Sequence, residues 1–310
     1  MKIFKPKFWQ KKNSLVAFSL LPISFLFQFL IALKNKIIKK EKFSIPIICV
    51  GNIYLGGTGK TPLCIEIAEI FKKSGLNAAI IKKSHRAHQD EFNLIKSKGI
   101  KLFKDTSRAS AIKEAEMQNF DLAILDDGLQ DSSIKKNLNI VCFNSEQLAG
   151  NEMTMPSGPL RESLSSVKNC KMVVINGVIN ELFEKKIKSF SDSISVYYTK
   201  YSPTNLNQFT NLNLLAFAGI GNPNNFFKIL EENNLKIKKK IYFPDHYNYS
   251  ERELSELVQY SITNKLKIVT TEKDYFRIQQ YQIQEIQCLK IKLEFQKKDN
   301  FERDLKKCLL

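Results

Sequence analysis

The chain has 310 residues, enough to bury a sizeable core and, at roughly 100 to 200 residues per domain, to form two domains. It carries 48 Lys and Arg residues against 31 Asp and Glu, a formal charge of +17, which favours an anionic partner: nucleic acid, an acidic membrane face or a phosphorylated substrate. A codon bias towards Lys, Asn and Ile explains the same excess equally well. The six cysteines form no C-x-x-C pair and lie mostly in apolar runs, which excludes a disulfide framework and a zinc site and indicates a reducing compartment.

Residues 13–33 contain no charged side chain, which predicts an apolar helix flanked on both sides by lysines. At about 1.5 Å per residue, such a helix just spans a hydrocarbon core of roughly 30 Å. Polar residues dilute the apolar run, so an interfacial helix and a buried core helix remain open beside a spanning one. A signal peptide fits worse, because no small-x-small site follows Leu33. The basic flanks favour contact with anionic headgroups, so we expect residues 1–40 to associate with a membrane.

An apolar run at 45–50 leads directly into GGTGKTP at 56–62, the order of a buried strand, a phosphate-binding loop and a helix. Glycines let backbone N–H groups surround phosphate oxygens, Lys60 reaches the β- and γ-phosphates, and Thr61 can bind Mg²⁺. The loop is a variant, since Tyr54 stands where the usual spacing has its first glycine. A turn that only joins strand to helix needs no Lys-Thr pair. The predicted nucleotide-binding residues are Tyr54, Leu55, Gly56, Gly57, Thr58, Gly59, Lys60 and Thr61.

Farther along, apolar runs of strand length alternate with helix-like segments, which is typical of a mainly parallel sheet with helices on both faces. The helix after the loop begins near Pro62 and ends near Gly75. A polar stretch at 201–213 predicts a linker to a second, smaller α/β unit with helices near 223–233 and 250–262. The predicted strands are 45–50, 78–81, 121–125, 138–143, 171–175, 194–199, 214–218, 238–243, 266–270 and 288–294.

The strand at 121–125 ends in Asp126-Asp127-Gly128, which places two carboxylates at its C-terminal tip. An acidic group that serves the Mg²⁺ of a bound nucleotide belongs at this end of a parallel strand. Paired Asp before Gly is also common in plain turns, but the phosphate loop favours the metal interpretation. The predicted metal residues are therefore Thr61, Asp126 and Asp127.

Six tracts occur together and in order. They are VGN at 50–52 leading into GGTGKTP, DDGLQ at 126–130, PSGPLRE at 156–162, AFAGIGNP at 216–223, DHY at 245–247 and TTEKD at 270–274. Jointly they resemble the tetraacyldisaccharide 4′-kinase family, the lipid A 4′-kinases of Gram-negative bacteria. The resemblance covers the chain from its apolar N-terminal segment to about Asp274.

The resemblance implies a P-loop enzyme that uses ATP and Mg²⁺ to phosphorylate the 4′-hydroxyl of a tetraacylated glucosamine disaccharide 1-phosphate in lipid A biosynthesis. Its fold would be α/β, a P-loop NTPase-like, mostly parallel sheet with helices on both faces, plus a smaller α/β domain and an N-terminal hydrophobic helix. We expect a membrane-associated helix at 1–40, the P-loop kinase domain at 41–205 and the smaller domain at 206–310. The enzyme would act at the cytoplasmic face of the inner membrane, anchored by its N-terminal helix, with the lipid and the membrane surface as partners and no evident protein partner.

Carried over by position, the resemblance assigns the catalytic roles to Lys60, Asp90 and His246. A sugar hydroxyl is a poor nucleophile, and Asp90 would accept its proton as the phosphoryl group transfers. His246 matches the family histidine that partners this carboxylate across a domain cleft. Its neighbours alone predict instead a turn capping a helix that begins near Glu251.

The chain departs from the family pattern in several places. The usual Ser-Arg-Gly-Tyr-Gly tract after the second strand is replaced by KKSHR at 82–86, where only Ser84 and Arg86 are candidates to stand in. Gln89 and Phe92 replace the Gly and Pro around Asp90, and Asp131 replaces the His that commonly follows DDG-x-Q. A divergent, weakly active kinase therefore remains an alternative.

A second alternative is a membrane-tethered P-loop ATPase or GTPase switch. Such a switch hydrolyses nucleotide without a sugar acceptor, and a guanine-specific one carries an N-K-x-D tract, which this sequence lacks. Nucleic-acid binding rests on the charge alone, because no motif interleaves aromatic and basic residues. We therefore expect no nucleic-acid partner.

Overall fold

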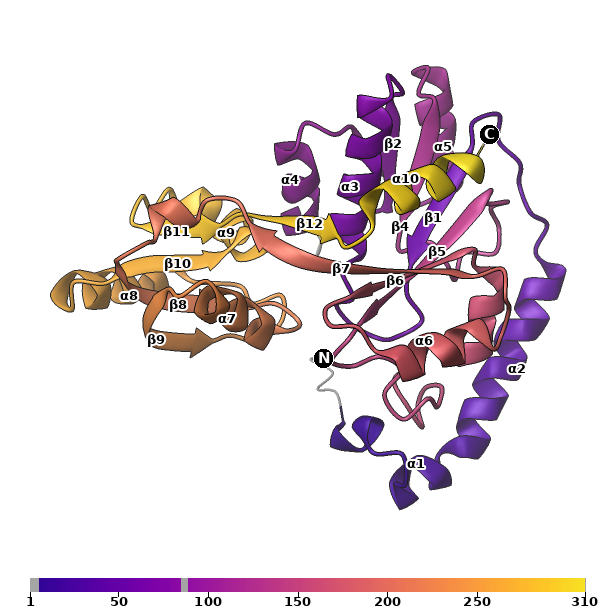
Figure 1. Cartoon of the computed structure of the whole chain (residues 1–310), viewed down its shortest axis with the longest axis horizontal. Coiled ribbons are helices and arrows are strands. Elements are labelled where there is room, and N and C mark those ends of the chain that lie inside the picture. Colours follow the sequence, from indigo (N-terminus) through magenta and orange to yellow (C-terminus); the bar gives the residue numbers. More distant parts are fainter. Residues whose placement is uncertain (1–5, 85–88, 310) are drawn as a thin grey trace. The chain divides into compact units, whose positions relative to one another are not determined.

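A computed structural model of the chain describes residues 6–84 and 89–309. Its contacts divide the chain into two compact units (Figure 1). Unit 1 comprises Met1–Lys83, Lys101–Lys200 and Glu294–Leu310, and unit 2 comprises Ser84–Ile100 and Tyr201–Leu293.

The first sheet has eight strands in the order β12-β7-β6-β5-β1-β4-β2-β3. The pairs from β7 to β3 are parallel, so the carboxyl ends of these strands lie at one edge of the sheet. The phosphate loop follows β1, which has the central place beside β4. The strands are β1 (Ile47–Gly51), β2 (Ala78–Lys83), β3 (Leu102–Asp105), β4 (Leu122–Asp126), β5 (Leu138–Asn144), β6 (Met172–Asn176), β7 (Ser195–Pro203) and β12 (Ile291–Phe295).

Helices and loops cover both faces of this sheet, because every residue of β1, β4 and β6 is buried. One face packs on α5 through Ala111, Ile112 and Ala115. In α10, Phe301 stacks on Phe295 of β12 at a centroid distance of 4.1 Å. After the N-terminal segment, the helices of unit 1 are α3 (Lys60–Lys73), α5 (Arg108–Met117), α6 (Glu181–Lys188) and α10 (Lys298–Lys307). The unit also contains the 3-10 turns η1 (Lys7–Gln10) and η3 (Leu164–Asn169).

The apolar N-terminal segment forms two helices, α1 (Leu15–Ser19) and α2 (Leu21–Ile37), where the sequence predicted one. Pro22, which has no backbone N–H to donate, lies in the first turn of α2. In the described part of the chain, no helix combines the length and apolar character needed to cross a bilayer.

Unit 2 is built on a four-stranded parallel sheet in the order β11-β10-β8-β9. Phe226 and Phe227 of α7 share an apolar cluster with Leu214 of β8. Leu254 of α8 belongs to a second cluster, which contains Leu215 of the same strand. The strands are β8 (Asn213–Ala218), β9 (Lys236–Tyr242), β10 (Lys267–Thr271) and β11 (Ile286–Leu289). The helices are α4 (Gln89–Ser97), α7 (Pro223–Glu232), α8 (Glu251–Thr263) and α9 (Glu272–Ile278), with 3-10 turns η4 (Leu206–Gln208) and η5 (Gln279–Tyr281).

This division differs from the expected boundaries in two places. Helix α4, expected in the P-loop domain, groups with unit 2. Two ion pairs join it to α9 there: Lys98 Nζ lies 2.8 Å from Glu272 Oε1, and Lys273 Nζ lies 2.5 Å from Glu91 Oε1. The predicted strand 288–294 is two strands, β11 in the second sheet and β12 in the first, so the chain returns to unit 1 for its last residues.

Candidate active site

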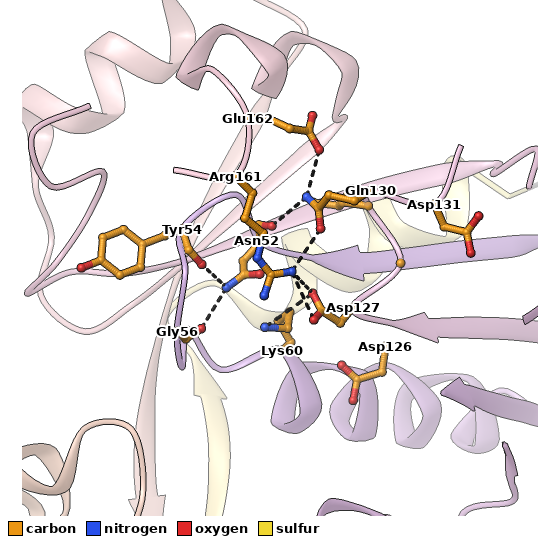
Figure 2. Close-up of polar contacts among 12 residues, drawn as sticks. Asn52, Tyr54, Gly56, Lys60, Asp126, Asp127, Gln130, Asp131, Arg161 and Glu162 are labelled. Carbon is orange, nitrogen blue, oxygen red and sulfur yellow. Dashed lines mark hydrogen bonds and ion pairs between the residues drawn. The ribbon is translucent and has the colours of Figure 1, made fainter. Parts of the chain in front are cut away.

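Asn52 shapes the loop between β1 and α3 in unit 1. Its side-chain amide donates to Tyr54 O at 2.6 Å and to Gly56 O at 2.9 Å, as Figure 2 shows. Gly56 and Gly59 have positive φ angles of 138° and 90°, which L side chains rarely adopt. Helix α3 begins with Lys60 directly after Gly59, so its positive N-terminal end follows the loop.

Tyr54, at the position of the missing glycine, is fully buried, and its hydroxyl accepts from Gln10 Nε2 at 2.8 Å. The PSGPLRE tract fixes the backbone on either side of it, because Leu55 N donates to Pro159 O at 2.9 Å and Arg161 N donates to Ile53 O at 2.6 Å. The side chain of Tyr54 therefore serves the core, and its contribution to the loop is made by its backbone.

Thr61 and Asp126 meet at the carboxyl end of β4. Thr61 Oγ1 donates to Asp126 Oδ2 at 2.8 Å, and Asp126 is completely buried. The other carboxylate oxygen, Asp126 Oδ1, is buried without a hydrogen-bond partner, and so is Thr58 Oγ1 in the loop. Buried polar atoms without partners are costly, so both atoms fit a site that binds a polar ligand.

Asp127 is paired with two cations in the same unit. Lys60 Nζ lies 3.7 Å from Asp127 Oδ1, and Arg161 Nη1 donates to Oδ1 at 3.1 Å and to Oδ2 at 3.3 Å (Figure 2). Burial raises the pKa of Asp127, but the nearby charges of Lys60 and then Arg161 lower it by more. The pKa of Asp127 therefore lies below its usual value. Its φ of 60° is left-handed, a conformation that Asp tolerates better than most residues.

Cations also fix the DDGLQ loop. Arg108 donates to Asp127 O at 2.7 Å and to Asp131 Oδ2 at 3.1 Å, and Lys136 Nζ donates to Gly128 O at 2.6 Å. Gln130 bridges the loop to the PSGPLRE tract, since its amide donates to Glu162 Oε1 at 2.9 Å. Asp131 thus helps to hold Arg108 beside this loop.

In unit 2, Arg277 brings Asp90 and His246 together. Its Nη2 donates to Asp90 Oδ2 at 2.5 Å and lies 3.4 Å from Nδ1 of His246, and that nitrogen is 4.0 Å from Asp90 Oδ2. Asp90 Oδ1 is buried without a hydrogen-bond partner. His246 has a left-handed φ of 54°. The helix expected near Glu251 begins there as α8, and Ser250, at the end of the same tract, caps it in a capping box with Glu253.

Asp274, from the TTEKD tract, holds Arg277 in place. It is fully buried and accepts from Gly219 N at 2.9 Å, Thr271 Oγ1 at 2.8 Å, Tyr249 OH at 2.9 Å and Arg277 Nη1 at 2.8 Å. Burial raises the pKa of Asp274 against the opposing effect of Arg277. Burial lowers the pKa of Arg277, but Asp274 and Asp90 raise it above its usual value.

Within residues 6–84 and 89–309, no group of three or more His, Cys, Asp or Glu side chains is arranged to hold a metal ion. This is compatible with Mg²⁺, which proteins often bind through one or two carboxylates together with substrate phosphates. The unpartnered oxygen of Asp126 beside Thr61 is the feature of unit 1 that fits such an ion.

Comparisons with known proteins show the family of the chain. The profile of the family described as tetraacyldisaccharide-1-P 4′-kinase matches residues 16–310. The chain belongs to this family. It is 42% identical to the tetraacyldisaccharide 4′-kinase of Pelagibacter ubique, over 98% of each chain, and 31% identical to that of Rickettsia typhi, over 96% of this chain and 97% of the relative. A crystal structure of LpxK from Aquifex aeolicus in complex with ATP has a similar fold, with a TM-score of 0.75 and 21% identity over 96% of this chain and 100% of that one.

Ser84 and Arg86 were the two candidates to stand in for the tract expected after the second strand. Of the two possible replacements, Ser84 is exposed at the end of β2, and Arg86 lies outside the described residues. Sequence reasoning assigned no role to Asn52, Arg161 or Arg277. Asn52 lies in the VGN tract and Arg161 in the PSGPLRE tract, and Arg277 follows Asp274 by three residues on α9. These positions pointed to the three residues, but only the contacts in the structure show what their side chains do.

Arg161→Met tests the charge balance at Asp127. The variant removes one of the two main cations that lower the pKa of Asp127, so we expect it to lose about 1 kcal/mol of stability near neutral pH. Because the folded-state pKa is lowered, this stabilisation is present above the ordinary value of 3.8 and is lost as the pH falls through the folded-state pKa. The urea midpoints of the wild type and of Arg161→Met, measured across pH, test this expectation, with the exposed Lys168→Met as control. A stability difference between wild type and Arg161→Met that does not shrink in acid would contradict it.

Proposed function

We propose that this protein transfers the γ-phosphoryl group of ATP to the 4′-hydroxyl of a tetraacylated glucosamine disaccharide 1-phosphate. Membership of the tetraacyldisaccharide 4′-kinase family over residues 16–310 is the observation that carries this proposal. The phosphate loop of unit 1 and the buried carboxylate of unit 2 supply the two kinds of group that the reaction requires.

The nucleotide end of the reaction uses unit 1. Lys60 and the N-terminal end of α3 bind the β- and γ-phosphates, with loop residues 54–59 around them. Thr61 and Asp126, with Asp127 beside them, would hold Mg²⁺, which supplies charge neutralisation on the phosphates when bound. Arg161 keeps Asp127 ionised and oriented towards Lys60.

The acceptor end uses Asp90 as the group that takes the proton of the sugar hydroxyl. Its unpartnered Oδ1 is available for that proton, while Arg277 occupies Oδ2. The side chain of His246 lies beside Arg277, 4.0 Å from Asp90 Oδ2, and is 37% exposed. It is therefore close to the Asp90 carboxylate and also accessible to solvent. Arg277 acts as a positioning residue, because its other nitrogen is fixed by Asp274 and Gly219 O.

We further propose that α2 lies against a membrane surface, at the cytoplasmic face where ATP is found. Its polar side chains face the protein, since Ser24 Oγ donates to Thr154 O at 3.0 Å and Gln28 Nε2 to Arg161 O at 3.2 Å. Ser24 and Gln28 are four residues apart and share one face of the helix. The apolar side chains are exposed, including Phe25, Leu26, Phe27, Phe29, Leu30 and Leu33. A continuous apolar surface followed by lysines fits anionic lipid.

Lys60→Ala and Asp127→Ala test the nucleotide end. Each should lower phosphoryl transfer at least about a hundredfold at saturating Mg²⁺, because each side chain serves phosphate or metal charge. The measurement is transfer of labelled phosphate from ATP to the purified disaccharide 1-phosphate lipid in mixed micelles. Lys73→Ala, an exposed lysine at the other end of α3, is the control. Hydrolysis of ATP by the wild type with no transfer to lipid would instead support a nucleotide switch.

Asp90→Ala and His246→Ala test the acceptor end. Each should lower kcat, Asp90→Ala by at least about a hundredfold, with little change in KM for ATP. The double variant should be scarcely worse than the poorer single one, since the two side chains act as a unit. Arg277→Met should lower kcat in the same way. Lys273→Met, which removes a different ion pair between α4 and α9, is the matched control, and an equal loss in it would reduce Arg277 to a structural role.

Phe25→Glu combined with Phe29→Glu tests the membrane proposal. Both side chains are exposed on α2, and each buried Phe contributes about 1.5 to 3 kcal/mol, so the binding to anionic vesicles should weaken at least about tenfold. The KM for lipid should rise more than the KM for ATP. Flotation with vesicles measures the binding, and Leu182→Glu, exposed on α6, is the control. Undiminished flotation of the double variant would overturn the proposal.

A further inference from the structure

Lys82 is a buried lysine at the carboxyl end of β2, in the tract where this chain departs from its family. The parallel register of β2 and β4 sets Lys82 beside Asp126, and its side chain is 6% exposed. Its Nζ lies 2.5 Å from Asp126 Oδ2 and 3.5 Å from Thr61 Oγ1. A charge removed from water in this way is tolerated only when it is paired.

The ammonium of Lys82 therefore contacts the same two side chains that would hold a divalent cation. Thr61 Oγ1 and Asp126 Oδ2 already share a hydrogen bond of 2.8 Å, and Lys82 closes the triangle. Two cations close to one carboxylate repel each other strongly in a site shielded from water. Lys82 and a metal ion thus compete for Asp126.

Lys60 shows the same arrangement one residue along the chain from Thr61. It is the phosphate lysine of the loop, and its Nζ lies 3.7 Å from Asp127 Oδ1. Each of the two adjacent aspartates is thus paired with one lysine, Asp126 with Lys82 and Asp127 with Lys60. When Lys60 binds a phosphate, the phosphate takes the place of Asp127 as the partner of its ammonium group. Lys82 has a side chain of the same length and can change partners in the same way.

We propose that Lys82 is a second phosphate-binding lysine, which neutralises Asp126 in the nucleotide-free protein, releases Asp126 and Thr61 to a divalent cation, and turns to the terminal phosphate of the nucleotide. This inference rests on the proposed nucleotide site. It assigns a role to the replaced tract: Lys82 supplies from β2 a positive group at the phosphates. On this proposal, the Asp126 carboxylate binds either Lys82 or the metal ion, but not both at once.

Lys82→Gln tests the proposal, because glutamine keeps a hydrogen-bond donor for Asp126 and removes the charge. The first measurement is Mn²⁺ titration of the nucleotide-free protein, followed by electron paramagnetic resonance. We expect Lys82→Gln to bind Mn²⁺ at least about fivefold more tightly than the wild type, since the competing cation is gone. The second is ATP affinity in EDTA by calorimetry, which should weaken at least about fivefold because one phosphate contact is lost.

Lys83→Met, the next residue of β2 and exposed, is the matched control and should change neither affinity. Unchanged Mn²⁺ affinity in Lys82→Gln would overturn the competition, and unchanged ATP affinity would overturn the phosphate contact. If Lys82→Gln does not fold, Lys82→Arg, which keeps the charge, is expected to retain both wild-type affinities within about twofold, and tighter Mn²⁺ binding in it would overturn the proposal. If Lys60→Ala also binds ATP in EDTA as the wild type does, the nucleotide site itself is misassigned, whereas a failure confined to Lys82 overturns this inference alone.

Discussion

The parallel register of β1, β4 and β2 is the constraint on which the nucleotide end of this protein depends. Val50 lies beside Asp126, and Asp126 lies beside Lys82, so three strands from separate parts of the chain end at one line across the sheet. Since successive side chains of a strand alternate between its faces, a shift of one residue in β4 or in β2 would turn Asp126 or Lys82 away from Thr61. The site is therefore specified by the same apolar strand residues that specify the core.

A second constraint comes from the PSGPLRE tract, which serves as a support for the phosphate loop. Gly158 has no room for a side chain, because a Cβ there would lie 2.2 Å from Asn151 Oδ1 and 2.3 Å from Met153 O. This close packing holds Pro159 and Arg161 against the start of the loop. A loop supported from outside in this way can dispense with its first glycine, and it places Tyr54 in the core instead.

The sequence predicted the parts of the fold that have strong local patterns. The strand before the phosphate loop, the helix after it and the strand before Asp126 all lie within a few residues of their predicted positions. The predicted strand at 288–294 was wrong as a single element, because a break at Lys290, whose N–H donates to Asn205 Oδ1 at 2.8 Å, divides it between two sheets. The grouping of α4 with unit 2 brings together side chains that are 174 and 182 positions apart in the sequence, and no local pattern records such contacts.

The N-terminal segment shows why composition alone left its role open. An apolar run broken by Ser and Gln is equally compatible with a core helix and a surface helix, because hydrophobicity does not say which face meets the protein. In the structure, the polar residues decide the orientation: Ser24 donates to Ser157 Oγ at 2.8 Å as well as to Thr154 O, so the interruptions in the run are its attachment points. The outward apolar face is then a direct consequence of where the few hydrogen-bonding side chains fall on the helix.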